Sequence, residues 1–209
     1  MTINVTLFND PACPWGYSAN PQFRVLEWRY GSQLDWRLVL IGLREDVSGL
    51  VEAGYDPVRA STRMSVFRRR YGMPFTPTPK PRAAASGRAC RAIVSARLVE
   101  PGSEWRALKA LQIANFTTPL LLDDDEQLRE VLRRLPGLDA DTTIDRIDDP
   151  EVEEAYQRDR AETRRAAGTP IELQAKSANS DGAVRFTAPS IIFELDGRRL
   201  DAGGWQPSL

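Results

Sequence analysis

The chain has 209 residues, 42% hydrophobic and 27% charged, and its formal net charge at pH 7 is −1. This is typical of a globular protein with one domain and a large insertion, or with two small domains. The near-neutral charge and the lack of any apolar run of roughly 18 residues give no reason to expect nucleic acid or a membrane as a partner. The start, MTINVTLF, lacks the basic and apolar segments of a secretory signal, so we expect a cytoplasmic protein.

Two scarce residue types exclude several kinds of site. The chain has no histidine, which excludes Ser-His-Asp and Cys-His catalysis and any histidine-ligated metal. Its two cysteines, Cys13 and Cys90, are too few for a four-thiolate zinc site or an iron–sulfur cluster. We therefore expect no bound metal.

The first quarter of the chain predicts a strand, a helix and a second strand. Residues 2–8 alternate and are rich in β-formers, and Asn9-Asp10-Pro11 ends the strand. A helix is expected from Pro14 to Gly31, where glycine stops it. The apolar run 34–43 is typical of a buried parallel strand, so this quarter predicts one right-handed βαβ unit.

The middle of the chain predicts only helices. The expected elements are a helix at 57–71, a proline-rich loop at 72–82, and helices at 83–98, 103–116, 124–135 and 149–167. The acidic run 123–126 lacks the spacing of a calcium loop and is interpreted as a helix start. Arg68-Arg69-Arg70 is interpreted as a solvated helix face, with an anion site for a thiol cofactor as the weaker alternative.

The last part of the chain returns to strands. Segments 184–186, 190–195 and 198–202 are expected to be strands, with Asp196-Gly197 closing a hairpin. The order βαβ, helical block, ββ predicts an α/β fold. We place one domain at 1–56 and 169–209 and a helical insertion domain at 57–168.

The most informative stretch is Phe8-Asn9-Asp10-Pro11-Ala12-Cys13-Pro14-Trp15-Gly16-Tyr17. It places Cys13 at a strand-to-helix junction, where the first backbone N–H groups and the helix dipole favour negative charge. Both effects stabilise a thiolate, so we expect a lowered thiol pKa and a nucleophile at neutral pH.

This stretch resembles the motif D-P-x-C-P-W-C-Y of the DsbA-like branch of the thioredoxin superfamily, especially its FrnE-type group. The resemblance implies a thioredoxin-like fold with a helical insertion, and it covers nearly the whole chain. It also implies a cis bond at Ala188-Pro189, facing the cysteine. The substrate-binding residues that it implies are Pro14, Trp15, Gly16, Ala188 and Pro189, with the Ala188 backbone bonding a peptide or a thiol tripeptide. The alternatives are a core position for Trp15 and an ordinary strand-entry role for Pro189.

The chain departs from the motif at Gly16, which stands where the second cysteine would be. Without that thiol a mixed disulfide on Cys13 must be resolved from outside. We therefore expect a thiol-disulfide oxidoreductase with Cys13 as its only catalytic nucleophile. Its partners would be a disulfide-containing protein or a small electrophile, with no tightly bound cofactor and a small thiol of the glutathione or mycothiol type as co-substrate. Cys90 is interpreted as a core residue, and a resolving role for it is the weaker alternative.

Two other functions stay open. Kappa-type glutathione transferases and 2-hydroxychromene-2-carboxylate isomerases share the insertion architecture and often use one Ser or Cys at the same helix start. A non-catalytic module that binds a peptide or an apolar ligand is the third possibility. The superfamily's last hairpin is followed by a helix, whereas this chain ends at Leu209, so we expect a partly bare sheet face that a second copy in a homodimer could cover.

Overall fold

The computed structural model describes residues 2–180 and 182–204, and the chain divides into two compact units. Unit 1 comprises residues 1–41 and 157–209, and unit 2 comprises residues 42–156. Our sequence boundaries, 56/57 and 168/169, lie 12 to 15 residues later than these. The expectation of a bare sheet face rests on residues 205–209, which lie outside the described part.

Hydrogen bonds explain both shifts of the boundary. The Arg44 carbonyl accepts from the backbone N–H groups of Ser86 and Gly87, each at 3.0 Å, so the segment after residue 41 belongs with the helices of unit 2. At the other end, the backbone N–H of Leu40 donates to the Asp159 carboxylate at 3.0 Å. That bond joins the second half of a long helix to the sheet of unit 1.

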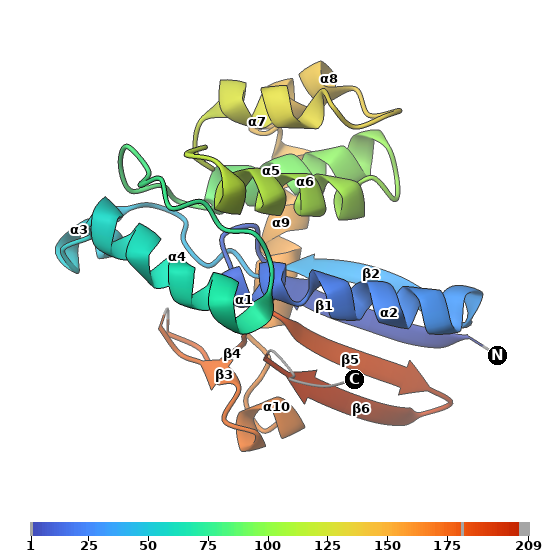
Figure 1. Cartoon of the computed structure of the whole chain (residues 1–209). Coiled ribbons are helices and arrows are strands. Elements are labelled where there is room, and N and C mark those ends of the chain that lie inside the picture. The colour runs from blue at the N-terminus through green and yellow to red at the C-terminus, as the bar shows by residue number, and fades with distance from the viewer. Residues whose placement is uncertain (1, 181, 205–209) are drawn as a thin grey trace. The chain divides into compact units, whose positions relative to one another are not determined.

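The core of unit 1 is a four-stranded sheet in the order β2-β1-β5-β6 (Figure 1). Its strands are β1 (Ile3–Asn9), β2 (Leu34–Leu40), β5 (Ser190–Leu195) and β6 (Arg198–Gly203). β1 pairs with β2 in parallel and with β5 antiparallel, as the predicted βαβ and ββ halves require. The β5–β6 turn has positive φ at Asp196 and Gly197, typical of a two-residue hairpin loop.

The predicted helix from Pro14 to Gly31 is two helices, α1 (Pro14–Ser18) and α2 (Asn20–Tyr30). The break falls at Ala19 because Pro21 has no N–H to bond the carbonyl four residues earlier. A short 3₁₀ turn, η1 (Gly31–Gln33), leads into β2. Figure 1 shows α2 lying along β1 and β2, where the Phe23 and Trp36 rings pack edge to face.

Small elements complete unit 1. They are the second half of α9 (Pro150–Thr163), α10 (Pro170–Leu173), β3 (Ser177–Ala178) and β4 (Arg185–Phe186). The Phe186 ring stacks on Phe8 of β1 at a centroid distance of 4.3 Å. This contact fixes β4, and the loop after it, beside the end of β1.

Unit 2 is helical, as its sequence predicts. Its elements are α3 (Ser48–Glu52), α4 (Pro57–Tyr71), α5 (Gly87–Val99), α6 (Glu104–Thr117), α7 (Asp125–Leu132), α8 (Ala140–Asp145) and the first half of α9. Buried apolar side chains of α5, α6 and α7, among them Ile93, Leu108 and Leu128, form its core. α3 and α8 are not predicted, because at five and six residues they are too short to show a helical period.

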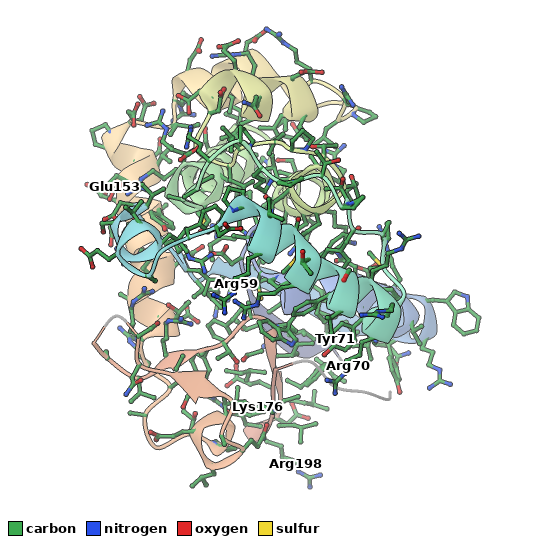
Figure 2. All side chains as sticks on the ribbon, turned by 60° about the vertical axis from the view of Figure 1, so that its left-hand side comes forward. Arg59, Arg70, Tyr71, Glu153, Lys176 and Arg198 are labelled. Atoms are coloured by element: carbon green, nitrogen blue, oxygen red, sulfur yellow. The ribbon has the colours of Figure 1, made fainter. Side chains whose placement is uncertain are left out.

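Two sequence interpretations in unit 2 match the structure. Asp124 is the N-cap of α7, accepting from the Gln127 N–H at 3.1 Å, so the acidic run begins a helix. Arg68, Arg69 and Arg70 are exposed on α4, with the Arg70 guanidinium over the Tyr71 ring. Figure 2 labels Arg59 and Arg70 near the two ends of this helix. Among the described residues, no helix is long and apolar enough to cross a membrane.

Candidate functional site

Cys13 is positioned by a tight turn that links β1 to α1. Asp10 builds this turn: its carbonyl accepts from the Cys13 N–H at 3.2 Å and its carboxylate accepts from the Ala12 N–H at 2.8 Å. Cys13 is extended, with φ −87° and ψ 114°, and caps α1, while Pro14 occupies the first turn. The expected N-cap geometry is therefore present.

The Cys13 sulfur joins the two ends of unit 1. Sγ accepts from the Gly16 N–H at 3.4 Å and donates its proton to the Ala188 carbonyl at 3.1 Å. The Ala188–Pro189 peptide bond is cis, as the resemblance implies. Cys13, Gly16 and Ala188 therefore meet at one point, although 175 positions separate Cys13 from Ala188 in the chain.

The expectation of a lowered Cys13 pKa is wrong for this structure. Cys13 is only 4% exposed, and burial raises the pKa of its thiol from 9.0 to about 12. The Gly16 and Trp15 N–H groups do lower the pKa, as a helix start should, but the loss of hydration outweighs them. The thiol is therefore protonated at neutral pH, and its proton is held by a carbonyl.

Two buried charged residues near the sulfur were not singled out from the sequence. Asp10 is fully buried and its charge raises the Cys13 pKa, whereas Arg185 is 7% exposed and its charge lowers it. The Arg185 guanidinium also donates to the Phe186 carbonyl and to the Ser180 hydroxyl. The only sequence signal for Arg185 is its position, four residues before Pro189.

Trp15 lies at the surface, with 46% of its area exposed, so the alternative of a core position does not hold. An apolar groove lies beside the cis peptide bond and measures about 450 Å³ with the open solvent at its mouth included. Trp15 does not line it. Ala19 and side chains of α2 line one wall, and Pro189 with β5 lines the other; the lining includes Phe23, Leu26, Ile191 and Phe193. Of the predicted binding residues, only Pro189 contributes to this groove.

Cys90 lies on the buried face of α5, with no exposed area, and both cysteines are free thiols. This placement within the unit 2 core matches the interpretation of Cys90 as a packing residue. Among the described residues, no group of three or more His, Cys, Asp or Glu side chains is arranged to hold a metal ion.

Comparisons with known proteins agree on the fold. A candidate protein disulfide isomerase from Nitrosomonas europaea superposes with a TM-score of 0.73 at 16% identity, over 99% of this chain and 92% of that one. The cytosolic disulfide reductase DsbM from Pseudomonas aeruginosa superposes with a TM-score of 0.65 at 17% identity, over 95% and 88% of the two chains.

A 2-hydroxychromene-2-carboxylate isomerase is also similar, with a TM-score of 0.55 at 18% identity over 96% of this chain and 88% of that one. No curated protein sequence matches the chain. The family model described as a DSBA-like thioredoxin domain matches residues 4–187, a span that contains Cys13, the helical unit and Arg185. With its α/β thioredoxin-like sheet and a cysteine capping the helix after β1, this chain belongs to the DSBA-like thioredoxin domain family.

Proposed function

We propose that this protein catalyses thiol-disulfide exchange with Cys13 as its only nucleophile. The observation that carries the proposal is the Cys13 sulfur at the N-cap of α1, bonded to Ala188 beside the cis peptide. The DSBA-like family supports a redox role, as does the structural similarity to DsbM, which is described as a cytosolic disulfide reductase. Gly16 in place of a second thiol supports a reaction that needs an external thiol.

The proposed reaction consists of two thiol-disulfide exchanges. Cys13 first loses its proton to solvent, and its thiolate attacks one sulfur of a substrate disulfide. A bond forms between the Cys13 sulfur and that atom, and the other substrate sulfur leaves as a thiolate. The thiolate of a small thiol of the glutathione or mycothiol type then attacks the mixed disulfide and releases Cys13. We propose that this takes place in the cytoplasm.

The structure sets a condition on the first exchange. The thiol proton is held by the Ala188 carbonyl, and burial disfavours the thiolate. A substrate that inserts its backbone beside Pro189 would take over the Ala188 carbonyl and free the sulfur. Pro14, Gly16, Ala188 and Pro189 would thus bind substrate through backbone and ring contacts, while the exposed Trp15 ring would cover it from outside.

Oxidised glutathione tests the proposal directly. We expect intact-mass measurement after incubation at mildly alkaline pH to show one glutathionyl group on wild-type protein and none on Cys13→Ser. Reduced glutathione added next should remove the group. Wild-type protein without an adduct, or equal modification of both proteins, would rule out exchange at Cys13.

A second candidate is a thiol-dependent transferase or isomerase. Two features favour it. A protonated Cys13 thiol could stabilise the thiolate of a bound small thiol, and the apolar groove beside Pro189 could hold a small apolar electrophile next to that thiolate. The chain's similarity to a 2-hydroxychromene-2-carboxylate isomerase shows a shared fold. Titration calorimetry with reduced glutathione and intact-mass measurement with oxidised glutathione separate the candidates: tight binding of the reduced form, with no adduct from the oxidised form, supports the second one.

A further inference from the structure

The space beside Gly16 is already filled. A Cβ atom built on Gly16 would lie 2.0 Å from the Asn9 side-chain oxygen and 3.0 Å from its Cγ. Real Cβ atoms do not approach other heavy atoms so closely, so any larger residue at position 16 requires Asn9 to move. The position where the related motif carries its second cysteine therefore has no room for a side chain.

Asn9 is held firmly in this place. Its side chain is buried, at 1% exposed, and its Oδ1 accepts from the Asp10 N–H at 2.8 Å. Its backbone carbonyl accepts from the Ile41 N–H at 3.0 Å, next to its pairing with Leu40 in the β1–β2 ladder. Because the backbone carbonyl and Oδ1 of Asn9 both accept hydrogen bonds, the side chain cannot withdraw without breaking a buried hydrogen bond.

We propose that Asn9 is a specificity-determining residue that keeps this a one-thiol site. Its carboxamide occupies the volume in which the side chain of a second cysteine would lie. The Gly16 N–H is 3.4 Å from the Cys13 sulfur, so a thiol at position 16 would stand within reach of that sulfur if the volume were free. This inference deepens the proposed function and depends on it for its catalytic consequence.

The consequence concerns the lifetime of the mixed disulfide. In a two-thiol site the thiolate at position 16 attacks the Cys13 sulfur, a bond forms between residues 13 and 16, and the substrate leaves as a thiolate that takes a proton from water. A carboxamide is not a nucleophile towards a disulfide. With glycine at position 16 the adduct on Cys13 persists until an external thiol arrives, and Asn9 fills the space that a resolving cysteine would need.

The steric part is tested without redox chemistry. We expect Gly16→Ala to lower the melting temperature by at least about 5 °C in the wild-type background, and by less than half of that in an Asn9→Ala background. Gly49→Ala is the matched control, because a Cβ there meets nothing within 4 Å. Equal losses from Gly16→Ala in both backgrounds would overturn the inference. If Asn9→Ala does not fold, Asn9→Ser replaces it.

The catalytic part uses 5,5′-dithiobis(2-nitrobenzoate) at mildly alkaline pH, with Cys90→Ala in every variant. The protein with Cys90→Ala alone should release one thionitrobenzoate and keep the other as a stable adduct. Gly16→Cys combined with Asn9→Ala should release both and lose two hydrogens by intact mass, at least tenfold faster than Gly16→Cys alone. Equal rates would overturn the inference. If Cys13 of the wild type takes no adduct, the proposed function fails, while the melting experiment still decides the role of Asn9.

Discussion

At the scale of single residues, two opposing effects act on the Cys13 sulfur. The first-turn N–H groups of α1 favour the thiolate, while burial and the Asp10 carboxylate favour the thiol. Burial is the largest of these effects, so the N-cap position does not by itself make the cysteine reactive. The sequence shows where the helix starts. It does not show how far the Cys13 side chain is hydrated, because that depends on residues of β4 and of the loop with the cis Ala188–Pro189 bond.

The raised pKa predicts a strongly pH-dependent reaction of Cys13. Below a pKa of about 12 the thiolate fraction rises with pH, so we expect alkylation by iodoacetamide to accelerate about tenfold per pH unit between about pH 8 and about pH 10.5. Peptide mass spectrometry would follow the labelling, with Cys13→Ser as the control. A rate that levels off below pH 8 would contradict the burial effect.

Replacing Asp10 should make the sulfur more reactive. Asp10→Asn removes a charge that raises the Cys13 pKa, and the amide oxygen can still accept from the Ala12 N–H. We expect alkylation of Cys13 at pH 9 to be about three- to tenfold faster than in the wild type. A slower reaction in a variant with an unchanged melting temperature would show that the Asp10 charge has the opposite effect.

At the scale of elements, one buried hydrogen bond attaches α9 to the sheet of unit 1. Asp159 is 7% exposed and accepts from the Leu40 N–H, whereas Glu162, one turn later, forms an outer ion pair with Arg37. We expect Asp159→Ala to cost about 1–3 kcal/mol in urea unfolding, because it leaves a buried N–H without that acceptor. Glu162→Gln, the control on the same helix, should cost at most about 1 kcal/mol. A larger loss for Glu162→Gln would reverse this ranking.

Most of the helices and strands could be predicted from the sequence. Local patterns predict the main elements: alternation predicts β1, an apolar run predicts β2, an Asp-Gly hairpin predicts β5 and β6, and helical periods predict the long helices. The break at Ala19 was predictable from Pro21 but was missed. β4 falls within the strand expected at 184–186, and its place beside β1 depends on the Phe8–Phe186 stack. β3 and α10 have four residues or fewer, too short for a local pattern to reveal them.

The candidate site was also predictable only in part from the sequence. Cys13, Gly16 and Pro189 could be selected because a motif and its spacing carry them. Asn9 stood in that motif, yet its role depends on the approach of its side chain to Gly16, a distance that only folding sets. Burial of the sulfur and the apolar groove likewise depend on segments brought together from both ends of the chain.

At the scale of the whole molecule, Cys13 should make folding stability fall at high pH. Its folded pKa of about 12 exceeds its ordinary value of 9.0, so between these values the unfolded chain loses the proton first and gains stability relative to the folded chain. We therefore expect the free energy of unfolding, relative to that of Cys13→Ala, to be constant below about pH 8 and to decline above pH 9.

Urea titrations of both proteins between pH 7 and pH 10.5 would measure this difference. The comparison is needed because Lys80 acts oppositely: burial lowers its pKa from 10.5 to about 8, so it should increase stability as the pH rises between those values. Both proteins share Lys80, and its effect cancels in the difference. A difference that stays flat up to pH 10.5 would show that Cys13 is hydrated in the folded state.

The close approach of Asn9 to Gly16 also bears on how this sequence can evolve. Two of the four glycine codons become cysteine codons by one nucleotide change, yet that change on its own would place a side chain against a buried carboxamide. A change at position 9 that comes first would give the new side chain space, so the order of mutations matters and the direct path passes through a less stable intermediate. Selection for folding stability would therefore act against a second thiol beside Cys13.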